Sequence, residues 1–273
     1  MSSKSAATEA QNGWTAVPVD PAKILHGKEY VHAPEPLDIS DIPWPKSDVV
    51  DKIHQICKDK LPEKVYNHSM RVYYYSLVGL PSTHAQTRAI RLAPLNTARL
   101  HAALASLRLT AGYAITTQQF RTTISLDTLA LASLLHDIGA TPANMHSTRM
   151  SFDLYGGILA LNMINESGGD KDQAEAVSET VIRHQDLGTE GNITLLGQVI
   201  QLATLYDNIG AHPGIIHEKT RESVNDKFSR EGWLGCFAET VEEEMRIKPW
   251  CHSTHVKDFA KTIRGCEYWK QYG

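Results

Sequence analysis

The stretch "ASLLHDIGAT", residues 132–141, ends an apolar run with a histidine and an aspartate side by side. The run before this pair places Leu129, Ala132 and His136 on one face of a helix, so the helix is expected to be buried. Asp137 follows at the C-terminal end, where a carboxylate opposes the helix dipole. The pair therefore indicates a binding role rather than a helix cap.

Three further segments combine a helical apolar period with a side chain that can bind a metal. These predicted helices, each with the residue that it carries on its apolar face, are 62–75 with His68, 170–188 with His184 and 193–210 with Asp207. Alternation of polar and β-branched residues is scarce along the chain. The sequence therefore predicts an all-α fold.

The overall composition is that of an ordinary globular protein. The chain has 273 residues, of which 42% are hydrophobic and 21% charged, and a formal net charge of −4. This charge gives no reason to expect nucleic acid as a partner. The four cysteines are far apart, the start of the chain lacks the apolar core of a signal peptide, and no apolar run is long enough to span a bilayer. We therefore expect a cytoplasmic protein without a membrane partner.

The chain divides into three regions by composition. Residues 1–12 are small and polar, and we expect them to be disordered. Residues 13–46 are rich in proline without a helical period, and we expect an extended arm that lies on the body of the protein. Such an arm suits a contact between subunits, so a homo-oligomer is expected. Residues 47–273 carry the helical domain.

One segment of the helical domain has an unusual composition. Residues 76–111 contain no acidic residue but four arginines, Arg88, Arg91, Arg99 and Arg108. Removing the segment joins "RVYYY" to "GYAITTQQF" and leaves a continuous helical pattern. Its 36 residues preserve a reading frame. The segment is interpreted as an insertion, either a basic amphipathic helix or the product of a retained intron or gene-model error.

Four polar side chains on or beside the apolar faces need partners. No lysine or arginine shares the faces that carry His68, His136, Asp137 and Asp207, and an unpaired polar group costs about 2–7 kcal/mol to bury. A divalent cation would satisfy all four at once. Each residue alone has a simpler explanation, such as a hydrogen-bonded core histidine at position 68. Only the agreement among four helices favours a metal site.

The order His, His–Asp, Asp on successive helices resembles the HD-domain metalloproteins, a helical superfamily made mostly of phosphohydrolases. A closer resemblance is to the fungal cyanamide hydratases, and it covers nearly the whole chain outside residues 76–111. The motifs that carry it are, in order, "NGWTAVPV", "YNHSMRVYYY", "LLHDIGAT", "STRMSFDLYGGI", "DQAEAVSETVIRHQDLG", "NITLLGQVIQLATLYDNIG" and "KPWCHSTH". The resemblance implies an HD-domain helical bundle.

The resemblance also implies an activity and a cofactor. The expected enzyme is a zinc-dependent hydro-lyase that adds water, activated by the metal, to the nitrile of cyanamide and gives urea. One zinc ion per subunit is held by His68, His136, Asp137 and Asp207, although mixed histidine and aspartate sites also accept Fe²⁺. His184, which can transfer protons near neutral pH, is the expected catalytic partner of this site together with Asp137. The alternatives for His184 are a metal ligand or a packed core residue.

Two asparagines, Asn67 and Asn208, adjoin predicted ligands and are candidate contacts for a small polar substrate, although helix neighbours point about 100° apart. Two other functions stay open. The first is a metal-dependent phosphohydrolase that acts on a nucleotide or another phosphomonoester. No glycine-rich phosphate loop appears, and Arg71 and Arg183 are predicted to point away from the ligand faces. The second is a non-catalytic, metal-stabilised protein whose activity the insertion disrupts.

Overall fold

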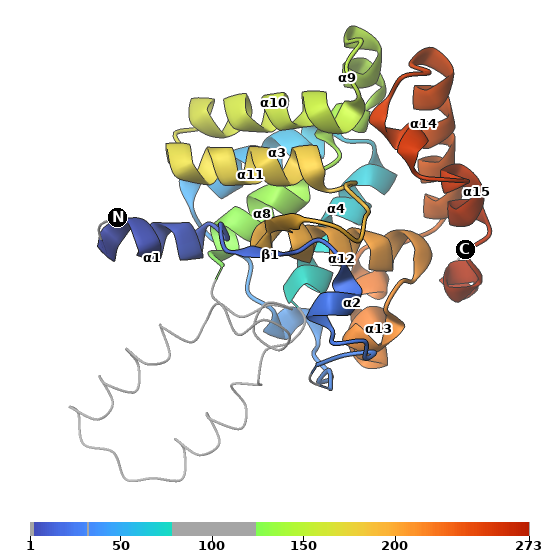
Figure 1. Cartoon of the computed structure of the whole chain (residues 1–273), viewed down its shortest axis with the longest axis horizontal. Coiled ribbons are helices and arrows are strands. Elements are labelled where there is room, and N and C mark those ends of the chain that lie inside the picture. Colours follow the sequence, from blue (N-terminus) through green and yellow to red (C-terminus); the bar gives the residue numbers. More distant parts are fainter. Residues whose placement is uncertain (1–2, 32, 78–123, 273) are drawn as a thin grey trace.

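The computed structural model describes residues 3–31, 33–77 and 124–272. Within these ranges the chain is helical apart from a small two-stranded sheet, so the predicted all-α class is confirmed (Figure 1). Most of the predicted insertion at 76–111 lies outside the described residues. No helix in the described ranges has both the length and the hydrophobicity of a membrane span.

The helices and strands follow one another along the chain in this order: α1 (Ser3–Gln11), β1 (Ala16–Pro18), α2 (Pro21–Ile24), α3 (Asp48–Lys60), α4 (Glu63–Leu77), α8 (Leu126–Leu135), α9 (Pro142–Ser147), α10 (Phe152–Glu166), α11 (Lys171–Arg183), β2 (Asn192–Thr194), α12 (Leu195–Ile209), α13 (Glu218–Lys227), α14 (Trp233–Ile247) and α15 (Phe259–Arg264). Short 3-10 helices lie between them: η1 (Ile39–Asp41), η2 (Ile138–Ala140), η3 (Pro213–Ile215), η4 (His252–His255) and η5 (Glu267–Tyr272).

Helix α8 forms the centre of the fold. Its residues from Thr128 to Leu135 are all buried, as expected of a helix that is apolar on every side. It packs against α3, α4, α11 and α12 (Figure 1). Because α8 leads directly into His136 and Asp137, this pair emerges in the interior of the helical body rather than at its surface.

Local signals in the sequence set the ends of the helices that surround α8. The side chains of Ser125, Asp170 and Thr194 accept hydrogen bonds from backbone N–H groups in the first turns of α8, α11 and α12. Gly210 ends α12 in the left-handed conformation, with φ of 65°. The predicted helices at 62–75, 170–188 and 193–210 are therefore confirmed, although α11 ends earlier than expected, at Arg183.

The N-terminal region is more ordered than its composition predicted. Where disorder was expected, residues Ser3–Gln11 form α1, whose end is anchored to the body because Asn12 Nδ2 donates to Asp172 Oδ2 at 2.7 Å. The stretch expected to be an extended arm is largely irregular, but it includes β1, α2 and η1. Its strand β1 pairs antiparallel with β2, with Val17 opposite Ile193.

Candidate metal centre

His68 lies in the middle of α4 and is fully buried. Its Nδ1 atom lies 2.6 Å from Asp207 Oδ2, and its ring stacks on Trp233 with centroids 4.2 Å apart and planes at 16°. A carboxylate only accepts hydrogen bonds when ionised, so the shared hydrogen is assigned to Nδ1. This leaves a lone pair on Nε2. Burial lowers the pKa of His68 to about 4 against the opposing effect of Asp207, so the ring is neutral near pH 7.

His136 and Asp137 lie where α8 ends. His136 Nδ1 donates to the carbonyl of Ser133 at 2.8 Å, so its Nε2 also carries a lone pair. Asp137 makes no side-chain capping bond to the short helix η2 that follows it. Both residues are almost completely buried. His136 occupies the C-terminal cap position of α8, whereas the side chain of Asp137 caps neither helix, as predicted.

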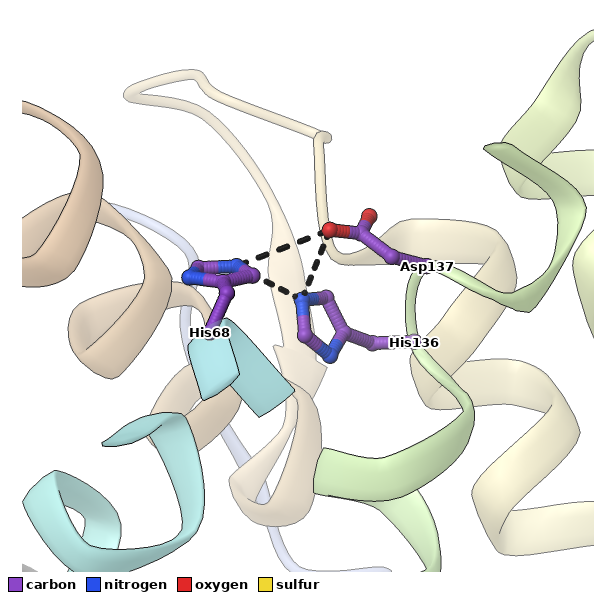
Figure 2. Close-up of side chains that lie close together, drawn as sticks. All are labelled: His68, His136 and Asp137. Atoms are coloured by element: carbon purple, nitrogen blue, oxygen red, sulfur yellow. Dashed lines mark hydrogen bonds and ion pairs between the residues drawn. The ribbon is translucent and has the colours of Figure 1, made fainter. Parts of the chain in front are cut away.

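Three ligand atoms on these residues face one point (Figure 2). The two Nε2 atoms of His68 and His136 lie 3.0 Å apart, and Asp137 Oδ2 lies 3.5 Å and 3.2 Å from them. Two lone pairs and a carboxylate oxygen this close repel one another unless a cation lies between them. Ligand atoms around a tetrahedral zinc ion, about 2.1 Å from the metal, are about 3.4 Å apart. The donors present therefore fit a divalent cation.

A second oxygen of the aspartate supports this fit. Asp137 Oδ1 is buried and has no hydrogen-bond partner among the described residues. Burial alone raises the pKa of this carboxyl group, but the neighbouring histidines, first of all His136, outweigh burial and hold the pKa well below its usual range. Asp137 is therefore an ionised, buried carboxylate that lacks its full complement of donors, which is the state of a metal ligand.

His184 lies directly after α11, on the other side of Asp137. Its Nδ1 atom donates to the carbonyl of Val181 at 2.6 Å, and its Nε2 atom lies 3.6 Å from Asp137 Oδ1. Burial alone lowers the pKa of His184, but the Asp137 carboxylate outweighs burial and raises it. His184 is not part of the three-atom group, and its position beside the second oxygen suits the predicted role in proton transfer.

Asp207 takes a different place from the one expected of a fourth ligand. It lies on the Nδ1 side of His68, whereas the three-atom group is on the Nε2 side. Its oxygens also accept hydrogen bonds from Arg71, at 2.8–3.1 Å, and from Arg230 Nη1. Burial raises the pKa of Asp207, but Arg230 and Arg71 outweigh burial and hold it below the usual range. In this arrangement Asp207 orients His68, and coordination of the metal by Asp207 stays a prediction.

The expectation that no arginine shares the ligand faces was wrong. Arg71 is fully buried and lies three residues after His68 on α4, about 60° around the helix, which is close enough for both side chains to reach Asp207. Arg230 reaches the same carboxylate from the loop between α13 and α14. By contrast, Arg183 points away as predicted and pairs with Asp186.

A cavity of about 130 Å³ opens beside the group. Its polar lining includes His136, Asp137, His184, Gln185, Thr204 and Asn208, and its apolar lining includes Leu187, Leu205, Ile209, Phe237, Val256 and Phe259. Lys257 is the one cationic side chain among the described residues that line it. The cavity is small and largely apolar, which suits an uncharged ligand of few atoms.

The two predicted substrate contacts differ in position. Asn208 lines the cavity, and its Oδ1 atom accepts a hydrogen bond from Trp233 Nε1 at 2.9 Å. Asn67 does not reach the cavity. It lies in a separate surface depression with Lys64 and Ser229, because it points away from His68 on the same helix. Asn208 therefore lines the cavity beside the ligand group and Asn67 does not, and a contact of Asn208 with substrate stays a prediction.

Sequence reasoning missed three residues that shape the site. Trp233 stacks on His68, Arg230 pairs with Asp207, and Phe237 extends the Trp233 stack at the cavity wall. No local pattern links these residues to His68. Only Arg71 had a usable signal, because its spacing of three residues from His68 places it on a neighbouring strip of the helix surface.

Comparison with known proteins adds a second line of evidence. No family model matches the chain. Two curated proteins of Saccharomyces cerevisiae (strain S288c), named cyanamide hydratase DDI2 and cyanamide hydratase DDI3, are similar to it. Each is 34% identical over 257 residues, which cover 93% of this chain and 96% of the yeast protein. The similarity is high and spans nearly the full length of both partners, so the chain belongs to the cyanamide hydratase family.

Proposed function

We propose that this protein is a metal-dependent hydratase that converts cyanamide to urea. The observation that carries the proposal is that three ligand atoms face one point next to a small cavity. They are His68 Nε2, His136 Nε2 and Asp137 Oδ2. The names of the two yeast relatives supply the substrate. The further placement of the chain in the HD-domain superfamily rests on the order of the ligands along the sequence.

The proposed cofactor is one Zn²⁺ per subunit, and Fe²⁺ is the alternative, because two imidazoles and a carboxylate suit both ions. A divalent cation held by His68, His136 and Asp137 supplies a nucleophilic oxygen at neutral pH by making water more acidic. The Nδ1 hydrogen bonds of both histidines leave their Nε2 lone pairs available to hold such an ion.

His184 is the proposed proton carrier. Hydration of a nitrile forms a C–O bond, breaks one C–N π bond and delivers a proton to the nitrile nitrogen. His184 Nε2 faces the cavity side of Asp137, so it can take the proton that water loses and pass it to that nitrogen. The isourea formed becomes urea when a proton moves from oxygen to nitrogen. Asp137 connects the two functions, because one of its oxygens faces the ligand group and the other faces His184.

Asn208 is the proposed substrate contact. Trp233 holds its Oδ1 atom, which leaves the Nδ2 hydrogens free to donate to a substrate in the cavity. A donor placed there would stabilise the nitrile nitrogen as it gains negative charge.

The phosphohydrolase alternative fits the site less well. A phosphate group needs several donors or cations around it. Among the described residues that line the cavity, only Lys257 is cationic, and both buried arginines at the site are engaged by Asp207. Arg149 lies in another depression, with His146 and Trp250.

The test is urea release from cyanamide by the purified full chain, before and after removal of metal with a chelator and after reloading with zinc. His136→Ala serves as the inactive control. Zinc binding without urea release, but with phosphate release from nucleotides, would overturn the proposal. The same assay on a variant without residues 76–111 tests the non-catalytic alternative, since activity of the shortened chain alone would show that the insertion blocks the site.

A further inference from the structure

Arg230 is a buried arginine that no predicted motif contains. Only 3% of its surface is exposed, and it lies in the loop between α13 and α14. Its guanidinium carbon lies 3.7 Å from the centre of the Trp269 ring, a close cation–π contact from the C-terminal helix η5. Its Nη1 atom donates to Asp207 Oδ1, while Nη2 has no hydrogen-bond partner among the described residues.

Arg230 and Arg71 hold the same carboxylate: Arg230 donates to Oδ1 of Asp207, and Arg71 donates to both of its oxygens. Arg71 binds Asp207 through Nε and Nη2, and its Nη1 atom donates to the carbonyl of Ser229 at 2.7 Å. This hydrogen bond from Arg71 to Ser229 fixes the loop that carries Arg230. Asp207 Oδ2 is then directed at His68 Nδ1. Three parts of the chain, α12, α4 and the loop between α13 and α14, thus meet at one carboxylate, which also contacts a ligand histidine.

Stability alone does not account for this arrangement. Burying two arginines for one carboxylate leaves an excess positive charge, and buried ion networks of this kind add little net stability. Histidines that bind metals, however, depend on a partner that fixes the ring and its tautomer, and loss of that partner weakens metal binding about 10–100-fold. Asp207 stands in that relation to His68, and Arg230 in turn fixes Asp207.

We propose that Arg230 is a positioning residue of the metal centre, which acts through Asp207 to aim His68 Nε2 at His136 and Asp137. The inference rests on the proposed metal site but not on the substrate. It also assigns a function to the contact between Arg230 and Trp269. Through this contact the C-terminal helix η5 holds Arg230 in place, and Arg230 holds Asp207 against the ligand His68.

The experiment compares the full-length wild type with Arg230→Met and Arg230→Gln. A matched control is Arg221→Met, because Arg221 is also buried and stacks on the same aromatic cluster, over Tyr268 at 5.4 Å, yet is hydrogen-bonded to Glu218. Three quantities are measured for each protein: zinc affinity by competition with a chromophoric chelator, the visible spectrum of the Co²⁺-loaded form, and the unfolding temperature of the metal-free form.

We expect Arg230→Met to weaken zinc binding about tenfold and to shift the Co²⁺ bands, which report ligand geometry. Arg221→Met should lower the unfolding temperature and leave both metal readouts as in the wild type. Where Arg230→Met does not fold, Arg230→Gln carries the same expectation. Wild-type affinity and spectrum in a folded Arg230 variant would overturn the inference alone. Failure of the wild type to bind either metal would overturn the proposed function as well.

Discussion

His184 Nε2 lies 3.6 Å from Oδ1 of Asp137, whose other oxygen faces His68 and His136. One carboxylate therefore touches both the candidate metal ligands and the candidate proton carrier. This geometry separates two functions that mutation can distinguish, because His184 lies beside Asp137 and edge-on to His136 but contributes none of the three ligand atoms.

Replacing His184 with glutamine should lower kcat for urea formation about 10²–10⁴-fold, the usual range for loss of a general acid–base group. Zinc affinity should stay within a few-fold of the wild type, since the ligand atoms are unchanged. Steady-state kinetics and metal titration test this. The control is His146→Gln, because His146 is half exposed and pairs with Glu243 far from the cavity. Loss of zinc binding in the His184 variant would instead assign it as a ligand.

Metal removal should destabilise the protein. A cation bound only by the folded chain stabilises it by about 2.7 kcal/mol at a free concentration one hundred times Kd. Adding a chelator should therefore lower the unfolding temperature of the wild type, and zinc should restore it. His136→Ala, which lacks one of the three ligand atoms, should show no such response. Equal unfolding temperatures with and without chelator in the wild type would contradict the metal site.

Much of this arrangement could be predicted from sequence, because it depends on short-range signals. Helix caps such as Ser125 and Gly210 act within a few residues of the helix end, and the inward positions of His68 and His136 follow from the apolar period. The full-length similarity then supplies the family.

The network around Asp207 could not be predicted in this way. Whether Asp207 binds a metal or an arginine depends on distances between α4, α12 and the loop that carries Arg230, and no local pattern fixes these distances. A buried histidine and a buried aspartate on apolar faces indicate only that each side chain has some polar partner or bound ion. The side of the His68 ring on which each partner lies appears only in the folded chain.

Asn208 and Asn67 offer a paired test of substrate binding. Asn208→Ala should lower kcat/KM for cyanamide about 2–10-fold, which corresponds to loss of one hydrogen bond of about 0.5–1.5 kcal/mol. Asn67→Ala should leave kcat/KM unchanged, because Asn67 lies in a separate depression. Steady-state kinetics of both variants decide the matter. An unchanged KM and kcat in Asn208→Ala would exclude Asn208 as a substrate contact.

His252 links the segment before α15 to the body of the protein and should make stability depend on pH. Its Nδ1 atom lies 2.5 Å from Asp153 Oδ2, and Asp186 and Glu244 also face it. The hydrogen bond to Asp153, above all, raises the pKa of His252 from its ordinary value of 6.5. Because the folded state holds the proton more tightly, this stabilisation is complete below the unfolded pKa and is lost as pH rises through the folded pKa.

The free energy of unfolding should therefore fall more steeply as pH rises above 6.5 in the wild type than in His252→Gln. Urea denaturation at several pH values measures the two slopes. His255→Gln is the control, since the Nδ1 atom of His255 contacts only the backbone carbonyl of His252 among the hydrogen bonds of the described residues. Parallel slopes for the wild type and His252→Gln would show that this pair does not contribute.

Gly139 controls how closely the chain after Asp137 approaches α10. A Cβ atom at this position would lie 2.0 Å from the carbonyl oxygen of Phe152, a backbone atom that cannot move aside alone. Gly139→Ala should therefore lower the free energy of unfolding by about 1–3 kcal/mol. The added methyl group must displace the backbone two residues from Asp137, so zinc affinity should fall as well.

Gly188→Ala is the matched control, with no atom within 4 Å of its added Cβ, and it should change stability by less than about 0.5 kcal/mol. Equal stability of the two variants would mean that the turn after Asp137 has room to relax, and that the glycine does not set the position of the carboxylate.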